Sequence, residues 1–326
     1  MTSLFRTPRT LILAAALGVA AFSALTAASA VHAAAPMAKV SAPGYFRMML
    51  GEFEVTALSD GTTELPVNKL LKTAPAKVDK ALARSFLASP LETSFNAYLI
   101  NTGSKLVLVD SGAGGLFGPN LGKLVANLKA SGYQPEQVDE IYITHLHPDH
   151  VGGIAKDGAA TFANAVVRAD KRDADFWLSQ ANMEKAPADA KGFFQGAMAS
   201  LKPYIDAKRF QPFEGDTQLV PGVKSSATYG HTAGHTSYVV ESGGKKLLLV
   251  GDLIHVGAVQ FDEPGVTIAF DSDEKAALAQ RMKAFSAAAK DGTWVGASHL
   301  QFPGIGHVRS AGKSYQWVPV NYTQMR

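Results

Sequence analysis

The segment Val138–His150, VDEIYITHLHPDH, runs an apolar stretch directly into four potential metal ligands. The apolar composition of Val138–Thr144 predicts a buried strand. His145 and His147 are two residues apart, so an extended strand end directs both rings to the same side. Pro148 cannot continue the strand, and the chain is expected to turn there. The segment therefore predicts a cluster of polar side chains at the end of a buried strand.

The turn after this strand adds an acid and a third imidazole, Asp149 and His150. Imidazole nitrogen and carboxylate oxygen together suit zinc, manganese or iron. A single histidine is more often structural, but four ligand types this close after an apolar strand are hard to explain by packing. We therefore interpret the segment as the start of a metal site.

Three further polar groups follow predicted strands downstream. Gly230–His235, GHTAGH, holds two histidines among small residues. Asp252 follows the strand Leu247–Val250 by one residue, and His299 follows the strand Trp294–Ala297. Sheets of alternating α/β proteins place their sites at strand ends, so we expect these groups to converge on the histidine cluster.

Strand and helix patterns interleave along the rest of the chain. Strands are predicted at Phe46–Leu58, Asn96–Ile100, Lys105–Val109, Val166–Ala169, Gln218–Thr228, Ser237–Glu241 and Lys246–Val250. Helices are predicted at Pro75–Leu87, Asn120–Ala130, Asp273–Ala289 and, for most of its length, Ala174–Ile205. A turn is expected at Ser59–Gly61 and a hairpin at Asn101–Ser104, and Ser272 or Asp271 is expected to cap the last helix. No linker divides the pattern, which indicates one α/β domain over residues 34–326.

The first 33 residues have the layout of a secretory signal peptide. Arg6 and Arg9 precede the apolar stretch Leu11–Leu25, and small residues allow cleavage after Ala30 or Ala33. The alternative is an uncleaved membrane anchor, since about 18 apolar residues can span a bilayer. The cleavage sites favour a periplasmic or secreted protein that leaves the membrane after processing.

Charge and cysteine content exclude several function classes. Without Arg6 and Arg9, 29 of the 31 basic side chains remain, against 28 acidic ones. A net charge this close to zero gives no support to nucleic-acid binding. The chain has no cysteine, so disulfides, thiolate ligands and a cysteine nucleophile are excluded.

The ligand order as a whole resembles the metallo-β-lactamase superfamily. The matching residues are His145, His147, Asp149, His150, His235, Asp252 and His299, and the segments 96–100 and 106–112 look like the early strands of that family. The resemblance implies a four-layer αββα sandwich of the α/β class. It also implies that His145, His147 and His235 hold one metal, that Asp149, His150 and His299 hold a second, and that Asp252 bridges them. His231 is then a supporting or structural residue.

Within the superfamily, the segments 251–255, 299–307 and 319–322 resemble the methyl parathion hydrolase and lactonase branch. The antibiotic-destroying members often use a cysteine on the second metal, which this chain does not have. The branch implies two divalent metals, zinc first and manganese, cobalt or iron as alternatives. A hydroxide that bridges them attacks an ester carbon or phosphorus, since paired cations lower the pKa of water towards about 7.

The same resemblance suggests further site residues. Asp149 or Asp252 is expected to relay a proton, and His255 is either a proton shuttle or a polar wall of the pocket. Asp110 either orients a metal-binding histidine or caps a turn, Asp60 offers the same choice, and His307 is expected to be structural. Substrate-binding positions are Leu70, Phe117, Trp177, Phe193, His255, Ile268 and Phe270. An aromatic pocket with few charges suits a small, neutral, hydrophobic ester.

The leading hypothesis is a secreted enzyme that hydrolyses lactones or aryl esters and, as a side activity, organophosphate triesters. One alternative makes phosphotriesters the main substrate. Others are a β-lactamase and a metal-binding or redox protein without hydrolytic activity. The branch also suggests a homodimer as a possible assembly.

Overall fold

The computed structural model describes residues 35–325, and the predicted signal peptide at residues 1–33 lies outside them. Residues 35–40 contain no helix or strand. All the elements described below belong to residues 41–325. Among the helices that the structure describes, none combines the length and the apolar character needed to cross a membrane.

The first sheet comes mainly from the first half of the chain. Its strands, in spatial order, are β1 (Tyr45–Leu50), β2 (Phe53–Leu65), β3 (Leu91–Asn101), β4 (Leu106–Val109), β5 (Glu140–Tyr142) and β8 (Val166–Arg168). The pairs from β1 to β4 are antiparallel, whereas β5 runs parallel to both β4 and β8. Strand β5 is thus buried between β4 and β8, as the apolar segment before His145 predicts.

The second sheet comes from the second half of the chain. Its strands, in spatial order, are β15 (Ser314–Pro319), β14 (Ile305–Ala311), β13 (Trp294–Gly296), β12 (Lys245–Leu249), β11 (Thr236–Ser242), β10 (Val223–Ala227) and β9 (Gln218–Val220). Only the pair β12 and β13 is parallel. A separate small ribbon pairs β6 (Ala155–Lys156) with β7 (Ala159–Ala160).

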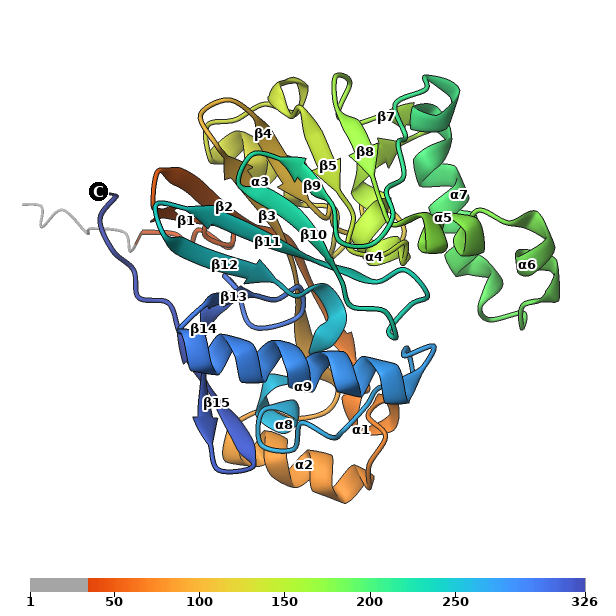
Figure 1. The fold of residues 1–326 in the computed structure, drawn as a ribbon. Helices are drawn as coiled ribbons and strands as arrows, with labels where there is room; N and C mark the ends of the chain where they lie inside the picture. The colour runs from red at the N-terminus through yellow and green to blue at the C-terminus, as the bar shows by residue number, and fades with distance from the viewer. Residues whose placement is uncertain (1–34, 326) are drawn as a thin grey trace, which may run out of the picture. The chain divides into compact units, whose positions relative to one another are not determined.

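The helices lie outside the pair of sheets, some on their outer faces and some beside them (Figure 1). They are α1 (Val67–Leu70), α2 (Pro75–Arg84), α3 (Leu124–Ala130), α4 (Pro148–Val151), α5 (Lys171–Trp177), α6 (Gln180–Lys185), α7 (Lys191–Asp206), α8 (Gly257–Gln260) and α9 (Glu274–Asp291). Three short 3-10 turns lie at Pro135–Gln137, Gly152–Ile154 and Gly251–Leu253. Figure 1 shows α1 and α2, from early in the chain, beside α8 from much later, and these three share one apolar cluster.

Three apolar clusters define four layers, α, β, β and α. Side chains such as Ile100 and Tyr142 from the first sheet pack against Tyr238 and Leu249 from the second, which fills the space between the sheets. Residues of α3 and α7 pack on the outer face of the first sheet, and residues of α9 pack on the outer face of the second. The predicted αββα sandwich is confirmed.

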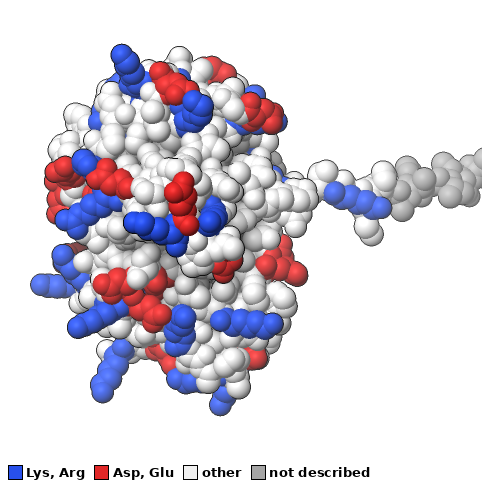
Figure 2. Space-filling model, turned by 90° about the vertical axis from the view of Figure 1, so that its right-hand side faces the viewer, with Lys and Arg blue, Asp and Glu red and all other residues white. Residues whose placement is uncertain are grey.

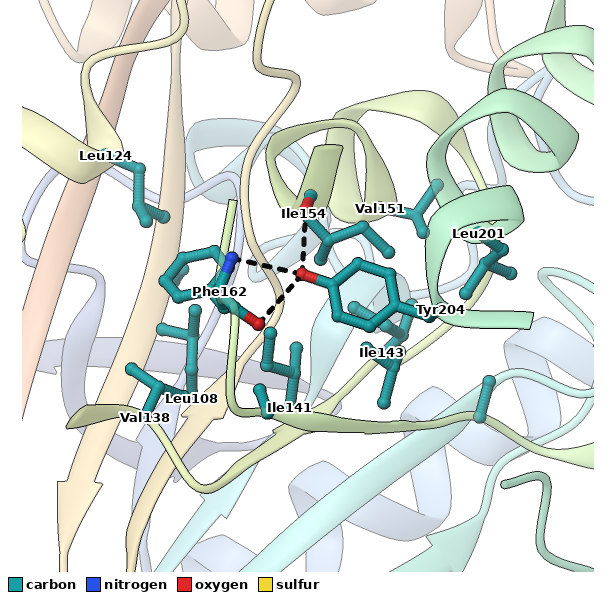
Figure 3. Packing of buried hydrophobic residues seen from close by; sticks show 14 of the residues in the cluster. Leu108, Leu124, Val138, Ile141, Ile143, Val151, Ile154, Phe162, Leu201 and Tyr204 are labelled. Atoms are coloured by element: carbon teal, nitrogen blue, oxygen red, sulfur yellow. Dashed lines mark hydrogen bonds between the residues drawn. The ribbon is translucent and has the colours of Figure 1, made fainter. Parts of the chain in front are cut away.

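The apolar cluster under α7 contains the buried hydroxyl of Tyr204, which both donates and accepts hydrogen bonds. Tyr204 lies among Val151, Ile141 and Leu201 (Figure 3). Its hydroxyl donates to the carbonyl oxygen of Ile154 at 2.9 Å and accepts from the backbone nitrogen of Phe162 at 3.1 Å. These bonds fix the segment that follows α4 against α7, and so stabilise the helix that carries Asp149 and His150.

Two local predictions are wrong for identifiable reasons. Ser59–Gly61 is not a turn but a bulge inside β2, because the carboxylate of Asp60 is drawn into the molecule. There it accepts from three backbone nitrogens of the 112–124 loop, those of Ala113, Gly122 and Leu124. Asp60 therefore holds that loop, and among the described residues its carboxylate makes no hydrogen bond to a histidine of the cluster.

The cap of α9 is Asp273, which accepts from the backbone nitrogen of Ala276, and neither Ser272 nor Asp271 takes this role. The predicted helical stretch Ala174–Ile205 is divided into α5, α6 and α7. The hairpin at Asn101–Ser104 is confirmed by the backbone bond from Thr102 to Lys105.

Charged side chains of both signs are mixed over the face shown in Figure 2. Blue and red groups alternate there without a large area of one sign. This face therefore offers no one-signed surface of the kind that binds a polyanion.

Candidate metal centre

The histidine cluster lies where the first sheet gives way to α4. β5 ends at Tyr142, the chain bends at Thr144, and His147, in an extended conformation, is the residue before the first turn of α4. Pro148 starts that turn, so Asp149 and His150 are carried by the helix. Nε2 of His145 and Nδ1 of His147 lie 2.9 Å apart, which confirms that the two rings face the same side.

Two groups of ligand atoms form at this point, with the atoms of each group within 4.8 Å of one another. The first group consists of His145, His147, His231 and Asp252. The second consists of Asp149, His150, Asp252 and His299. The downstream groups at the ends of β12 and β13 thus converge on the HxHxDH segment, as the strand-end argument predicts.

Asp252 belongs to both groups. Its Oδ2 atom lies 3.3 Å from Nε2 of His231 and 3.6 Å from Nε2 of His145. Its Oδ1 atom lies 3.2 Å from Nε2 of His150 and 3.2 Å from Nε2 of His299. A carboxylate that offers one oxygen to each group has the geometry of a bridge between two cations.

The chemistry of these residues fits divalent metal ions. Nε2 of His150 and Oδ1 of Asp252 are buried and, although they lie 3.2 Å apart, neither has a partner in hydrogen-bond geometry within residues 35–325. Such orphaned polar atoms are rare in folded proteins and call for a bound group. Nitrogen and carboxylate ligands without sulfur suit zinc, manganese, cobalt or iron.

Electrostatics also favour cations at this centre. Burial alone would raise the pKa of Asp252, but the surrounding imidazoles, His150 first, hold it well below its usual range. Burial would lower the pKa of His299, yet Asp252 and Asp149 raise it to about 10. The carboxylates thus attract positive charge strongly, and a metal ion competes with protons for the same nitrogen atoms.

The selection of His235 as a ligand is contradicted by the geometry. Its Nε2 accepts a hydrogen bond from the backbone nitrogen of Asp252 at 3.1 Å, and its Nδ1 lies 2.9 Å from Oγ1 of Thr228. Both ring nitrogens are therefore used inside the protein, and His231 occupies the ligand position instead. Spacing along Gly230–His235 could not decide this, because both histidines follow β10 within a few residues and only the loop conformation separates them.

Supporting groups orient three of the metal-group histidines through their second nitrogen. Nδ1 of His150 lies 2.9 Å from Oδ2 of Asp110, and Nδ1 of His231 lies 2.8 Å from Oδ1 of Asp271. Nδ1 of His299 lies 3.1 Å from the carbonyl oxygen of Ser94. Each contact fixes a ring with its other nitrogen facing the cluster, which is the usual supporting arrangement in metal sites. Of the two roles left open for Asp110, the orienting role is the one seen.

Asp173 was missed by the sequence reasoning and ties the two histidine loops together. Its carboxylate accepts from the backbone nitrogen of Leu146 at 2.8 Å and from that of Gly234 at 2.7 Å. Burial raises the pKa of Asp173 to about 6. Asp173 lies in the first turn of α5, and an acid there gives no sequence signal for such a role, since acids are common at helix N-termini.

A pocket of about 220 Å³ opens directly onto the metal groups. It is lined by Thr63, Leu65, Phe95, Phe117, His147, Asp149, Phe193, Asp252, His255, Phe270 and His299. The predicted wall residues Phe117, Phe193, Phe270 and His255 are therefore present. Thr63, Leu65 and Phe95 were missed, although alternation along β2 and β3 puts them on one face and could have indicated them.

Three predicted wall residues lie elsewhere. Leu70 and Ile268 pack in the apolar cluster around α1, α2 and α8, because Ile268 pairs with Leu71 through an isolated bridge. Trp177 is buried one layer deeper, with its ring centroid 5.1 Å from that of His147. It supports a metal-group histidine and does not line the pocket.

His255 stands at the boundary between the pocket and the metal groups. Its Nε2 lies 3.1 Å from Oδ2 of Asp252, and its ring stacks on that of His299 with centroids 5.1 Å apart. Its Nδ1 is buried and has no hydrogen-bond partner in the described part of the chain. His307, by contrast, packs against Trp294 with the ring centroids 3.8 Å apart, in agreement with a structural role.

A model of the metallo-beta-lactamase superfamily matches residues 93–299, the span that holds both ligand groups. This chain is a member of the metallo-beta-lactamase superfamily. Its sandwich, the HxHxDH segment after β5 and the bridging position of Asp252 all lie within that match.

Curated relatives of this superfamily member include N-acyl homoserine lactonases. One from Bacillus cereus is 28% identical over 161 residues, which cover 49% of this chain and 56% of the relative. One from a Bacillus species is 32% identical over 120 residues, which cover 37% of this chain and 40% of the relative. The chain thus aligns with about half the length of the curated lactonases.

Similar solved structures cover much more of the chain. A hydrolase of the beta lactamase superfamily, AbOPH, is 40% identical with a TM-score of 0.83, over 87% of this chain and 100% of that one. AidC, a dizinc quorum-quenching lactonase in complex with a product, is 26% identical with a TM-score of 0.78, over 86% of this chain and 99% of that one.

Proposed function

We propose that this protein is a secreted, dinuclear metal hydrolase that cleaves lactones or aryl esters. The observation that carries the proposal is Asp252, which offers one oxygen to each ligand group at the floor of an apolar pocket. The similarity to lactonases, one of them described as a dizinc enzyme, supports an ester substrate and zinc as the metal.

When bound, two divalent cations supply a Lewis acid for the ester oxygen and a source of nucleophilic water at neutral pH. The ligand residues fix where this chemistry occurs, since five imidazoles and two carboxylates meet within the two groups. Because water is the nucleophile in this chemistry, no side-chain nucleophile is needed, in keeping with the absence of cysteine.

The remaining residues bind and orient the ester. Phe95, Phe193 and Phe270 surround the apolar part of the pocket and exclude water from the group that lies against them. Asp149 lines the pocket and lies 3.3 Å from Nε2 of His150 and 3.4 Å from Nε2 of His299. Asp149 is thus placed to accept a proton at its carboxylate.

His255 is placed to contact the leaving group, because it both lines the pocket and reaches Asp252. Aryloxides leave with little help from an acid, whereas alkoxides released from lactones need a proton. We therefore propose that His255 matters more for lactones than for aryl esters.

Organophosphate triesters are a second candidate substrate, as a side activity. Apart from His255 and the histidines and acids of the metal groups, Thr63 is the sole polar residue among the described pocket-lining side chains. A wall of this kind accepts a neutral aryl phosphotriester as readily as a carboxylic ester. It holds no Lys or Arg among the same residues to pair with the carboxylate of a β-lactam, so we expect β-lactamase activity to be weak.

A kinetic screen with defined metal content tests the proposal. Purified protein loaded with zinc or manganese is assayed on an N-acyl homoserine lactone, a phenyl ester, methyl paraoxon and nitrocefin. The expected order of kcat/KM places the lactone or the phenyl ester first and nitrocefin last. Protein with two metals per chain that turns over none of these compounds would refute a hydrolytic function and support a metal-binding or redox role.

A further inference from the structure

Arg281 has the largest fully buried side chain among the described residues, with 0% of its surface exposed. It lies on α9, and no carboxylate of residues 35–325 forms an ion pair with it. Burial lowers its pKa, which reflects how poorly its surroundings solvate the charge. A buried charge is costly unless it is paired or well hydrogen-bonded, so its contacts must explain why it is tolerated.

Its guanidinium binds backbone carbonyls of one segment. Nε donates to the carbonyl oxygen of Leu253, and Nη1 donates to those of Pro264 at 3.0 Å and Val266 at 2.6 Å. Leu253 directly follows the bridging residue Asp252. The planar, rigid fork of an arginine fixes the relative positions of such acceptors more firmly than the single ammonium of lysine does.

Gln260 extends this contact to the backbone of His255. Its Oε1 accepts from the backbone nitrogens of His255 and Val256 at 2.8 and 2.9 Å, and its Nε2 donates to the carbonyl of Val266 at 3.0 Å. The Val266 carbonyl therefore receives both Arg281 and Gln260. The result is a buried, connected network from α9 to both ends of the 253–266 segment.

The far end of the segment carries a wall of the substrate pocket. Beyond Val266, the backbone of Thr267 and Ala269 bonds to that of Lys72 and Leu70 beside α1, and Phe270 then lines the pocket. Asp252 and His255, at the near end, line the same pocket. The distance from the metal groups to the Phe270 ring is thus set by a segment whose shape Arg281 holds.

We propose that Arg281 is a positioning residue that sets the width of the pocket between the Asp252–His255 end and Phe270. It thereby selects esters by the size of the group that lies against Phe270. The selectivity part of this inference rests on the proposed ester hydrolysis, whereas the positioning part does not. No ligand of either metal group bonds to the guanidinium itself, so both metals are expected to stay bound when Arg281 is changed.

Hydrogen exchange of the metal-loaded protein tests the positioning part. In Arg281→Met and Arg281→Lys, amides of residues 253–270 are expected to exchange about tenfold faster than in the unchanged protein, with two metals per chain retained. Arg209→Met is the matched control, because Arg209 also binds two carbonyls, those of Phe162 and Ala165, away from the pocket. It should accelerate exchange around 162–165 and leave 253–270 unchanged.

Two lactones of different size test the selectivity part. The ratio of kcat/KM for dihydrocoumarin to that for γ-butyrolactone is expected to change about tenfold in Arg281→Met, mainly through KM, since a misplaced wall acts on the larger group. Arg281→Lys should recover part of the ratio, and Arg209→Met should leave it unchanged. The lysine variant keeps the charge and serves as the test if the methionine variant does not fold.

Each result decides one part of the inference. A folded variant with unchanged exchange at 253–270 overturns the positioning role. Equal losses on both lactones overturn the selectivity and indicate a general loss of stability. If the unchanged protein hydrolyses neither lactone, the proposed function fails on its own, and the exchange data still decide the role of Arg281.

Discussion

The assignment of the third imidazole of the first metal group can be tested with a matched pair of variants, His231→Gln and His235→Gln. The two residues are four apart in one loop and are both fully buried. Glutamine places an amide oxygen near the position of Nε2 but is a poor ligand for zinc. The His231 variant therefore removes a metal ligand, whereas the His235 variant changes only internal hydrogen bonds.

The expected effects follow from the contacts of each ring. His231 supplies one of the four ligand residues of the first group. Loss of a supporting residue alone costs metal affinity about 10–100-fold, so loss of a ligand should cost at least about 100-fold. His235 accepts from the Asp252 nitrogen, and the amide oxygen of glutamine can keep that bond. Its replacement should cost less than about 1.5 kcal/mol of unfolding free energy, the scale of one internal hydrogen bond.

The assay is metal content by mass spectrometry after dialysis against a weak chelator, together with thermal unfolding. His231→Gln should fall from two metals per chain towards one and lose most activity. His235→Gln should keep two metals and lose no more than about 6 °C in Tm. The reasoning is refuted if His235→Gln loses a metal while His231→Gln keeps both.

Further predictions concern the second metal group, the pocket and the N-terminus. Asp110→Asn should lower the binding affinity for one of the two metals about 10–100-fold in a chelator competition, because the contact that orients His150 is lost. An unchanged affinity would rule out an orienting role. Phe193→Ala should raise KM for an aryl ester about tenfold and leave metal content unchanged, since it removes apolar wall area; an unaltered KM would place the aryl group elsewhere. Under the proposed secretion, N-terminal sequencing should find a chain that begins at Val31 or Ala34, whereas a chain that begins at residue 1 would indicate the anchor.

Much of the fold follows from local patterns in the sequence. The apolar segment before His145 predicts a buried strand, and its centre forms the buried strand β5, although β5 ends at Tyr142 before the two histidines. Pro148 ends the extended segment, and α4 begins at this residue. These are local steric effects, and they operate in the same way in any context.

The wrong local predictions share one cause, which is competition from distant partners. Asp60 was expected in a turn, but three backbone nitrogens of the 112–124 loop draw its carboxylate inward and make a bulge. Ser272 or Asp271 is predicted to cap the last helix, but Asp271 is bound to His231, and Asp273 caps α9 instead. A single sequence gives no distance between such partners, so it cannot rank them.

The sequence by itself determined the superfamily, the αββα sandwich and six of the seven ligand positions that the structure brings together. It did so because ligand type and strand-end position are properties of short segments. Only the tertiary structure decided between His231 and His235. The backbone nitrogen of Asp252 donates a hydrogen bond to His235, which leaves the ring of His231 for the metal group. The same holds for Phe95 in the pocket and for Arg281 behind it, because burial and the partners of a buried group are set by segments far away in the chain.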